Sequence, residues 1–261
     1  MRQTRLLRTI TALLLLACTT SPHAAGTAHI AAASNLINVL NDISEQYRTE
    51  SGNRITLSFG SSGDIARQII QGAPYQLFIS ADRAYLDTLS ENGIEFAAVT
   101  PFVQGQIILF IPNESMLSGI SDAGGIVKRL YNGEYRRIAI ANPEHAPYGV
   151  AAREALTHAG LWVFEQKRLL IGENAAQTMQ FALNGSVDLA VVPAAYAYLP
   201  ETTRRGTVVP IPADWYQPVR QYMVLLKNAG PTATGFYHYL LSERVRGIVE
   251  RQGYTTDVLH N

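Results

Sequence analysis

The sequence has one cysteine, few charged residues and no excess of charge of either sign. Charged residues make up 16% of the 261 positions, and 21 lysines and arginines balance 21 aspartates and glutamates. A chain without net positive charge has no electrostatic basis for binding nucleic acid. A lone cysteine excludes an internal disulfide, so the 47% of hydrophobic residues must stabilise the core by themselves. The composition therefore predicts a globular protein with no nucleic-acid partner.

Several motifs that carry chemistry are also missing. The chain has no Gly-x-x-x-x-Gly-Lys-Ser phosphate loop, no Gly-x-Gly-x-x-Gly and no His-Glu-x-x-His. Its six histidines are scattered without metal-ligand spacing, and only His145 falls in a candidate site loop, where we expect a structural or surface role. We therefore predict no cofactor and no metal that is coordinated directly by side chains.

The longest uncharged apolar run lies at the N-terminus. Three arginines precede an apolar segment at 10–17, and small and polar residues follow, which is the pattern of a secretory signal at 1–25, too short to span a bilayer. Cys18 follows Leu-Leu-Ala, which resembles the lipobox of a bacterial lipoprotein, so the cysteine is either discarded or acylated as the first mature residue. Removing the signal leaves 18 basic residues against 21 acidic ones, and both cleavage positions predict export.

Short apolar runs alternate with segments of helical periodicity along the rest of the chain. From His29 to Gly93 the predicted order is strand, helix, strand, helix, strand, helix, which indicates an α/β fold with mostly parallel sheets flanked by helices. Two further strands, at 106–111 and 221–226, are expected to cross between lobes near Gln104 and Pro218. We therefore expect a discontinuous first lobe at 29–105 and 219–261, a second lobe at 106–218, and a hinge of two segments.

One local pattern occurs four times, in which a strand ends in small or polar residues at the start of a helix. Ser34 and Asn35 follow the first strand, Gly-Ser-Ser-Gly at 60–63 follows the second, and the loops at 142–149 and 172–176 precede two later helices. A helix start exposes unpaired N–H groups at the positive end of the helix dipole, which can bind an anion without lysine or arginine. Taken singly, Gly-Ser-Ser-Gly also suits a flexible turn, and Tyr148 also suits a packing aromatic.

Five separated motifs resemble one known family. They read Ala-Ala-Ser-Asn at 32–35, Gly-Ser-Ser-Gly at 60–63, Gln-Gly-Ala-Pro at 71–74, Phe-Ile-Ser-Ala-Asp at 78–82 and Asn-Pro-Glu-His-Ala-Pro-Tyr-Gly at 142–149. Together they resemble the periplasmic molybdate-binding proteins of ABC transporters, over nearly all of the mature chain. The resemblance implies a two-lobed type II periplasmic binding protein fold and a periplasmic monomer, either free or lipid-anchored through Cys18. Such a protein is not an enzyme: it captures molybdate or tungstate and delivers it to a membrane permease.

The resemblance also implies the ligand-binding residues. Ser34, Asn35 and Ser62 would bind the oxyanion from the first lobe, with Ser61 as the alternative to Ser62, and Tyr148 and the backbone N–H of Ala175 would bind it from the second. Some relatives place a tyrosine ligand just after the strand that here ends in Pro193, a residue with neither hydroxyl nor N–H. The tyrosine assignment therefore falls on Tyr148.

Two alternatives stay open at this stage. The first is a receptor for another anion, such as sulfate; an organic acid is disfavoured because no arginine lies in the four loops to bind a carboxylate. The second is an exported serine hydrolase with Ser62 as nucleophile and His145 as base. This alternative ranks low, since the chain lacks the Gly-x-Ser-x-Gly elbow.

Overall fold

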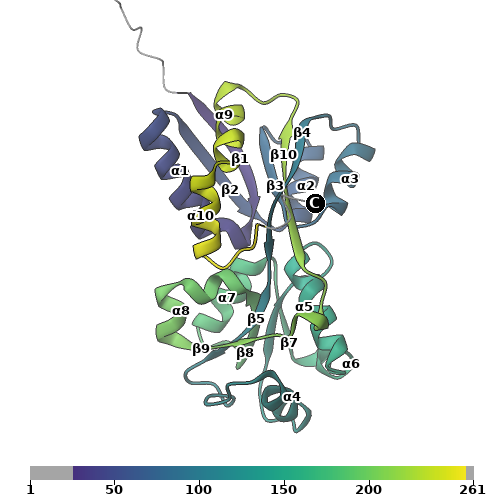
Figure 1. The fold of residues 1–261 in the computed structure, drawn as a ribbon. Helices are drawn as coiled ribbons and strands as arrows, with labels where there is room; N and C mark the ends of the chain where they lie inside the picture. Colours follow the sequence, from purple (N-terminus) through teal and green to yellow (C-terminus); the bar gives the residue numbers. More distant parts are fainter. Residues whose placement is uncertain (1–25, 257–261) are drawn as a thin grey trace, which may run out of the picture.

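The fold comprises two lobes, one above the other in Figure 1, each built around a five-stranded sheet. The computed structural model describes residues 26–256, without the side chains of 164–166. The predicted signal segment and Cys18 lie outside the described residues. Among the described helices, none combines the length and the hydropathy that a membrane span requires.

The first lobe contains the strands and helices at both ends of the described chain. Its strands are β1 (Thr27–Ala33), β2 (Arg54–Gly60), β3 (Leu77–Ser80), β4 (Phe96–Gly105) and β10 (Val219–Leu226). Its helices are η1 (Ser34–Leu36), α1 (Ile37–Ser51), α2 (Ser62–Ile70), α3 (Ala84–Glu91), α9 (Pro231–Leu240) and α10 (Glu243–Arg251).

The second lobe is formed by the middle of the chain. Its strands are β5 (Ile107–Pro112), β6 (Ile138–Ala141), β7 (Leu169–Gly172), β8 (Leu189–Pro193) and β9 (Gly206–Pro210). Its helices are α4 (Ala123–Tyr131), α5 (Pro147–His158), α6 (Trp162–Glu165), η2 (Gln166–Arg168), α7 (Ala175–Leu183), η3 (Ala194–Tyr198), α8 (Pro200–Arg205) and η4 (Ala213–Trp215).

The two sheets have the same topology. Their strand orders are β2-β1-β3-β10-β4 and β7-β6-β8-β5-β9. In each sheet three strands pair in parallel, the fourth pairs antiparallel to its neighbours on both sides, and the fifth therefore runs with the first three. Four of five strands share one direction, so the expectation of an α/β fold with mostly parallel sheets flanked by helices is confirmed.

The chain passes between the sheets on extended segments. Strand β4 ends at Gly105 in one sheet and β5 begins at Ile107 in the other, so Gln106 alone separates them. The chain returns after β9 and enters β10 at Val219, which pairs with Gly105. The paired crossing segments run side by side between the lobes in Figure 1.

Helices cover both faces of each sheet, which explains the near-continuous apolar strands. In the first lobe, Ile30 and Ile79 pack against α1, α9 and α10 on one face, while Ala31 and Phe78 pack against α2 and α3 on the other. The second lobe repeats this arrangement with α4 and α5 on one face and α7 on the other. Burial of each large apolar side chain contributes on the order of 1.5–3 kcal/mol.

The structure differs from the sequence-based expectation in local detail. Strands β4 and β9 were not expected, and both are edge strands. A 3₁₀ turn, η1, precedes the first α-helix where a direct helix start was expected. Helix α5 begins at Pro147 and not at Val150, because proline suits the first helical position. Tyr148 therefore lies in the first turn of a helix and not on a loop.

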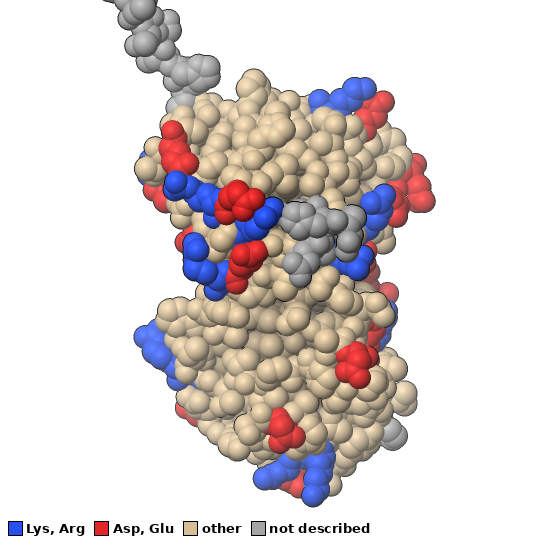
Figure 2. Space-filling view, viewed as in Figure 1, with Lys and Arg blue, Asp and Glu red and all other residues tan. Residues whose placement is uncertain are grey.

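Charged side chains on the face shown in Figure 2 lie in small mixed groups. Mixed groups of basic and acidic residues lie mainly on the upper lobe, fewer charges are spread over the lower lobe, and that face has no broad basic surface. This distribution agrees with the balanced composition.

Candidate functional site

The carboxyl ends of the parallel strands place the predicted residues at the edges where the two sheets face each other. Ala33 at the end of β1 pairs with Gly60 at the end of β2, so Ser34 and the two serines after Gly60 emerge side by side. Ala141 and Gly172 pair in the same way in the second lobe, upstream of α5 and α7. Ligands of open α/β sheets bind outside these carboxyl ends.

Contacts between the lobes bring the two edges together. The N–H of Gly63 in α2 donates to the carbonyl of His145 in the second lobe, at 3.0 Å. Ala33 belongs to the same buried cluster as Tyr148 and Ala175, and α7 contacts the turn that contains Ser34. The structure therefore collects the four predicted helix starts in one region between the lobes.

The structure separates the roles of the two adjacent serines. Ser62 is fully buried, and its Oγ accepts a hydrogen bond from the Ala81 N–H at 2.9 Å, which leaves the hydroxyl proton free to be donated. Its own N–H, at the first position of α2, has no intrahelical acceptor. Ser61 instead caps α2: its Oγ accepts from the Asp64 N–H and donates to the Asp64 carboxylate at 2.6 Å. These contacts favour Ser62 as the donor to a ligand.

Two buried tyrosines hold the backbone around Ser34 and Asn35. Tyr254 donates to the Asn35 carbonyl at 2.9 Å and accepts from the Asn35 Nδ2 at 3.1 Å. Tyr196, three residues beyond Pro193 in the second lobe, donates to the Ser34 carbonyl at 3.3 Å. Burial raises the pKa of both phenols, so both stay protonated donors. No local sequence signal identified either tyrosine, because each lies more than 150 residues from its partner.

Tyr148 lies in the first turn of α5 with 4% of its surface exposed. Its hydroxyl accepts from Gln221 Nε2 at 3.4 Å, so the proton remains free for another acceptor. Gly105 makes room for it, because a Cβ at that position would lie 2.0 Å from the Tyr148 oxygen. Burial, together with the neighbouring tyrosines, raises the pKa of Tyr148 well above its ordinary value. The phenol is thus a neutral hydrogen-bond donor over the physiological pH range.

Ala175 begins α7 and contributes its backbone. The preceding Asn174 caps the helix, and its Oδ1 accepts from the N–H groups of Ala176 at 3.0 Å and Gln177 at 3.1 Å. The Ala175 N–H is not used by this cap and, at the first helical position, has no intrahelical acceptor. It is buried at the positive end of the helix dipole.

The donors gathered between the lobes are all neutral. No lysine or arginine is among the buried residues in the described part of the chain. Hydroxyl groups and N–H groups at helix starts suit a small, fully deprotonated oxyanion, which accepts hydrogen bonds at every oxygen. The arrangement offers no activated nucleophile: His145 contacts Ser61 and not Ser62, and the Ser61 proton is donated to Asp64.

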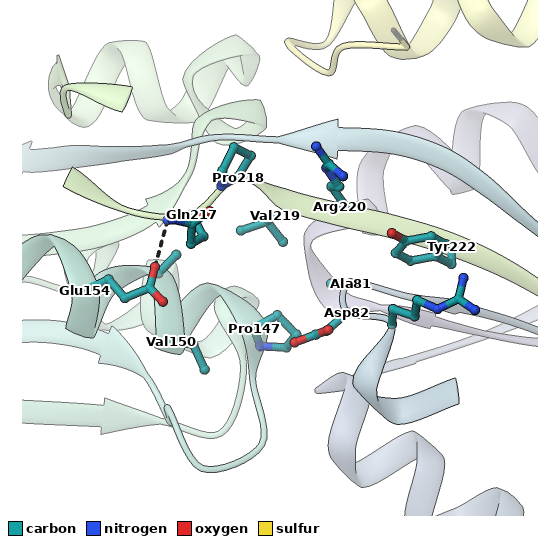
Figure 3. Close-up of a pocket in the computed structure, with 12 residues that line it drawn as sticks. Ala81, Asp82, Pro147, Val150, Glu154, Gln217, Pro218, Val219, Arg220 and Tyr222 are labelled. Atoms are coloured by element: carbon teal, nitrogen blue, oxygen red, sulfur yellow. Dashed lines mark hydrogen bonds between the residues drawn. The ribbon is translucent and has the colours of Figure 1, made fainter. Parts of the chain in front are cut away.

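A cleft of about 250 Å³ flanks these donors beside the hinge (Figure 3). Asp82 and Arg83 line it from the first lobe, Pro147 and Glu154 from α5, and Arg220 from β10. The cleft does not contain the predicted ligand residues, but it reaches Ala81, whose N–H donates to Ser62, and Pro147, the chain neighbour of Tyr148. It is therefore an approach to the donor region and not the donor region itself.

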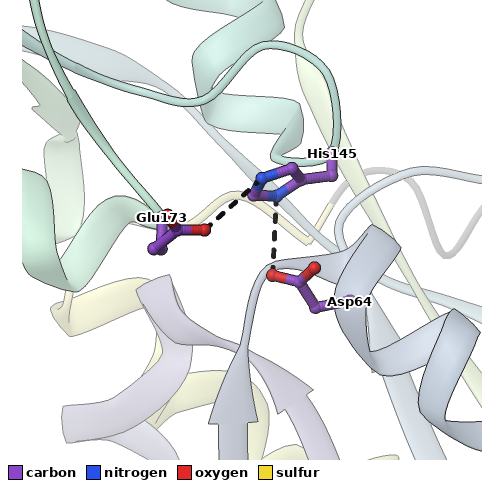
Figure 4. Close-up of side chains that lie close together, drawn as sticks. All are labelled: Asp64, His145 and Glu173. Carbon is purple, nitrogen blue, oxygen red and sulfur yellow. Dashed lines mark ion pairs between the residues drawn. The ribbon is translucent and has the colours of Figure 1, made fainter.

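Three ionisable side chains meet at the other side of the interface (Figure 4). Asp64 comes from α2, His145 from the loop before α5 and Glu173 from the loop before α7. The carboxylates approach different ring nitrogens: Asp64 Oδ2 lies 3.5 Å from Nδ1, and Glu173 Oε2 lies 3.6 Å from Nε2. A metal ion binds one nitrogen of an imidazole. The imidazole therefore lies between the two carboxylates, with one carboxylate at each ring nitrogen, and this arrangement is not that of a metal centre.

Comparison with known proteins assigns the family. Residues 28–255 match the family profile described as bacterial extracellular solute-binding protein. The chain belongs to the bacterial extracellular solute-binding proteins. These are binding proteins and not enzymes, which bears out the prediction of a non-enzymatic protein.

Individual relatives of this solute-binding protein agree over nearly its whole length. It is 29% identical to the molybdate-binding protein ModA of Azotobacter vinelandii over 243 residues, which cover 92% of this chain and 93% of the relative. It is 29% identical to ModA of Rhodobacter capsulatus over 250 residues, or 95% of each chain. The solved structure of the Azotobacter vinelandii periplasmic molybdate-binding protein superposes with a TM-score of 0.79 at 29% identity, covering 88% of this chain and 99% of that one.

These comparisons confirm the resemblance drawn from the five motifs and the two-lobed fold that it implied. Relatives of this kind also indicate an extracytoplasmic location. The ligand-contacting residues and the boundaries of the lobes remain predictions.

Proposed function

We propose that this solute-binding protein captures molybdate, and equally tungstate, outside the cytoplasm and delivers it to the permease of an ABC transporter. The observation that carries the proposal is the set of neutral donors contributed by helix starts of both lobes. The names of the relatives support the choice of anion. The proposed ligand set is Ser34, Asn35, Ser62, Tyr148 and Ala175.

A dianion transferred from water into this region would exchange hydration for hydrogen bonds from hydroxyl and N–H groups. Several helix N-termini would offset its charge, each contributing on the order of 0.3–1 kcal/mol. Protonated phosphate would place an O–H against one of these donors, which provides discrimination. Discrimination against sulfate would rest on the size of the site, since sulfate is also a deprotonated tetrahedral dianion. Molybdate and tungstate share charge and shape, so we expect both to bind.

The proposed lobes are 29–105 with 219–261, and 106–218, joined at the two crossing segments. Ser34, Asn35 and Ser62 belong to the first lobe, and Tyr148 and Ala175 to the second. An anion that contacts both lobes favours the closed arrangement by its differential affinity for that state. We further propose that the mature protein is a monomer, either released after cleavage of the signal or anchored by lipid at Cys18.

Isothermal titration calorimetry with molybdate, tungstate, sulfate and phosphate tests the proposal. We expect molybdate and tungstate to bind and the other two anions to bind far more weakly or not at all. A matching thermal-shift series should follow, since ligand at about 100 times Kd adds roughly 2.7 kcal/mol to stability. Equal binding of sulfate, or no binding of molybdate, would overturn the assignment.

The Ser62→Ala variant tests, in the same calorimetric assay, whether Ser62 binds the anion. Removing a hydroxyl that donates to a charged group costs about 1.5–3 kcal/mol, or roughly 10- to 150-fold in affinity. Ser90→Ala is the matched control, because Ser90 is exposed at the end of α3. Unchanged molybdate affinity in Ser62→Ala would remove this residue from the site.

A further inference from the structure

We propose that Gln221 is a positioning residue for Tyr148: its buried side-chain N–H holds the phenol oxygen, so that the hydroxyl proton is committed to the oxyanion. The proposal deepens the proposed function and rests on it, because Tyr148 belongs to the proposed ligand set. Gln221 is not in that set, and it acts through Tyr148 and not by contact with the anion.

Gln221 is a fully buried polar residue on an otherwise apolar face of β10. Residues 219, 221 and 223 point to the same side of the strand, and both Val219 and Met223 belong to buried hydrophobic clusters. The opposite side carries Arg220 and Tyr222, which line the cleft in Figure 3. Burial of an amide is unfavourable unless the amide is hydrogen-bonded, so Gln221 requires a partner on the apolar side.

The partner of Gln221 is the hydroxyl of Tyr148. Gln221 Nε2 donates to this hydroxyl at 3.4 Å, and within the described part of the chain the hydroxyl makes no other hydrogen bond. Gly105 leaves room for the contact, because a Cβ there would lie 2.0 Å from the Tyr148 oxygen and 3.6 Å from Gln221 Nε2. Gly105 pairs with Val219 at the start of β10. The amide and the phenol therefore lie together where the two crossing segments pass α5.

The direction of this hydrogen bond determines where the Tyr148 proton can go. A phenol has one proton, and a hydroxyl oxygen that accepts from an amide N–H still has that proton to donate. An acceptor in place of the N–H would bind the proton and withdraw it from a ligand. Donation by the amide also polarises the phenol, which strengthens its own hydrogen bond to an anion. Burial raises the pKa of Tyr148, so the proton is present over the physiological pH range.

The other end of the Gln221 amide argues against a purely structural role. Its Oε1 is buried and has no hydrogen-bond partner among the described residues. A buried acceptor without a donor destabilises a fold by more than one neutral hydrogen bond typically stabilises it. Methionine has a similar length and would fill this apolar position without leaving an amide oxygen unpaired. The amide is therefore unfavourable for folding, and its contribution is the direction that it gives to the Tyr148 proton.

Calorimetry with molybdate tests the proposal on the wild-type protein, Gln221→Met, Tyr148→Phe and the double variant. We expect Gln221→Met to weaken binding about two- to tenfold, as the loss of one neutral hydrogen bond does, and to cause no further loss in the Tyr148→Phe background. Gln180 is exposed on α7, so Gln180→Met is the matched control and should bind like the wild type. Wild-type or higher affinity in Gln221→Met overturns the proposal, as does an equal loss in both backgrounds.

Urea unfolding of the ligand-free proteins separates positioning from a structural role. We expect the unfolding midpoint of Gln221→Met to equal or exceed that of the wild type, because the unpaired Oε1 is removed. A residue that only stabilises the fold would show a lower midpoint after substitution. A midpoint below that of both the wild type and Gln180→Met therefore overturns the proposal.

A third measurement separates failure of the positioning from failure of the proposed function. If neither molybdate nor tungstate gives binding heat with the wild-type protein, the proposed function fails. The side-chain amide resonances of Gln221 in the ligand-free protein, recorded by NMR for the wild type and for Tyr148→Phe, then decide the contact. Phenylalanine keeps the ring and removes only the hydroxyl, so a shift at Gln221 without a shift at Gln180 supports donation to the phenol. Unchanged Gln221 resonances overturn the proposal, whatever the ligand.

Discussion

Gly63→Ala should weaken oxyanion binding without lowering the stability of the fold. Gly63 is the second residue of α2 and its φ is not positive, so alanine can adopt the same backbone conformation. The added Cβ would lie 2.8 Å from the His145 Cβ and 3.0 Å from the His145 carbonyl oxygen, both in the other lobe. Its third close neighbour, at 3.0 Å, is the ring of Tyr85, a half-buried side chain that can move aside. The clash therefore acts mainly on the contact between the lobes.

The substitution should have opposite effects on the stability of helix α2 and on the contact between the lobes. Alanine in place of glycine stabilises a helix by about 0.5–1 kcal/mol. Forcing a methyl group into a closely packed contact costs about 1–3 kcal/mol, which corresponds to a roughly 5- to 150-fold loss of affinity if closure accompanies binding. We thus expect weaker binding of molybdate and tungstate, by the same factor, with an unfolding free energy that is unchanged or slightly higher.

Calorimetry and urea unfolding measure the two quantities. Gly124→Ala is the matched control, because Gly124 is also the second residue of its helix, α4, and is exposed. Its new Cβ would meet only the Asp122 side chain, at 3.3 Å. Gly124→Ala should raise the unfolding free energy slightly, as alanine does in a helix, without loss of molybdate affinity. If Gly63→Ala binds molybdate with wild-type affinity, the claim that binding requires this close approach of the lobes is refuted. If its unfolding free energy falls by as much as its binding free energy, the claim that the substitution affects binding and not folding is refuted.

Two further predictions concern a tyrosine and an aspartate. Tyr148→Phe should weaken molybdate binding about tenfold or more, because it removes a proposed donor to the anion. Burial raises the pKa of Tyr148, so ionisation of this phenol should not reduce the affinity of the wild-type protein as the pH rises towards about 10. Calorimetry across that pH range would reveal an earlier loss of affinity. For the fully buried Asp188, burial acts to raise the pKa, but hydrogen bonds from Arg136 and the Met116 N–H outweigh it, and the pKa is lowered. Its stabilisation is therefore present above the unfolded-state pKa of about 3.9 and is lost as the pH falls below it. Asp188→Asn should lower the unfolding free energy at pH 7 by about 2–4 kcal/mol and lessen the acid-induced decline; urea unfolding with an undiminished decline would contradict this account.

The sequence predicted those parts of the site that depend on local structure. Ser62 and Ala175 each occupy the first position of a helix, where the N–H is free whatever the rest of the fold does. The first position of a helix can be located from the sequence alone, where an apolar strand is followed by a small residue and then by apolar residues at helical spacing. The choice between Ser61 and Ser62 needed the structure, because only the hydrogen bonds show that Ser61 caps α2.

Residues that act across long stretches of chain left no local signal. Tyr254 holds the Asn35 carbonyl from 219 positions away, and Tyr196 reaches Ser34 from the other lobe. Their positions follow from the packing of the lobes and not from any periodicity. The contact of His145 with Ser61 left no local signal for the same reason, since the two residues are 84 positions apart.

The missed strands have a different physical explanation. Strands β4 and β9 lie at the edges of their sheets and are only partly buried. An edge strand needs no continuous apolar run, and it tolerates proline, as at Pro101 in β4 and Pro210 in β9. The signals that identified the central strands were therefore absent from both.

The proposed ligand donors differ chemically from the ionisable groups between the lobes. The donors of Ser62, Tyr148 and Ala175 are neutral and buried, so their state does not change with pH near neutrality. The ionisable groups Asp64, His145 and Glu173 lie together at the junction of the lobes. Under the proposed function, selectivity among oxyanions is determined by the size of the site and the direction of its neutral donors.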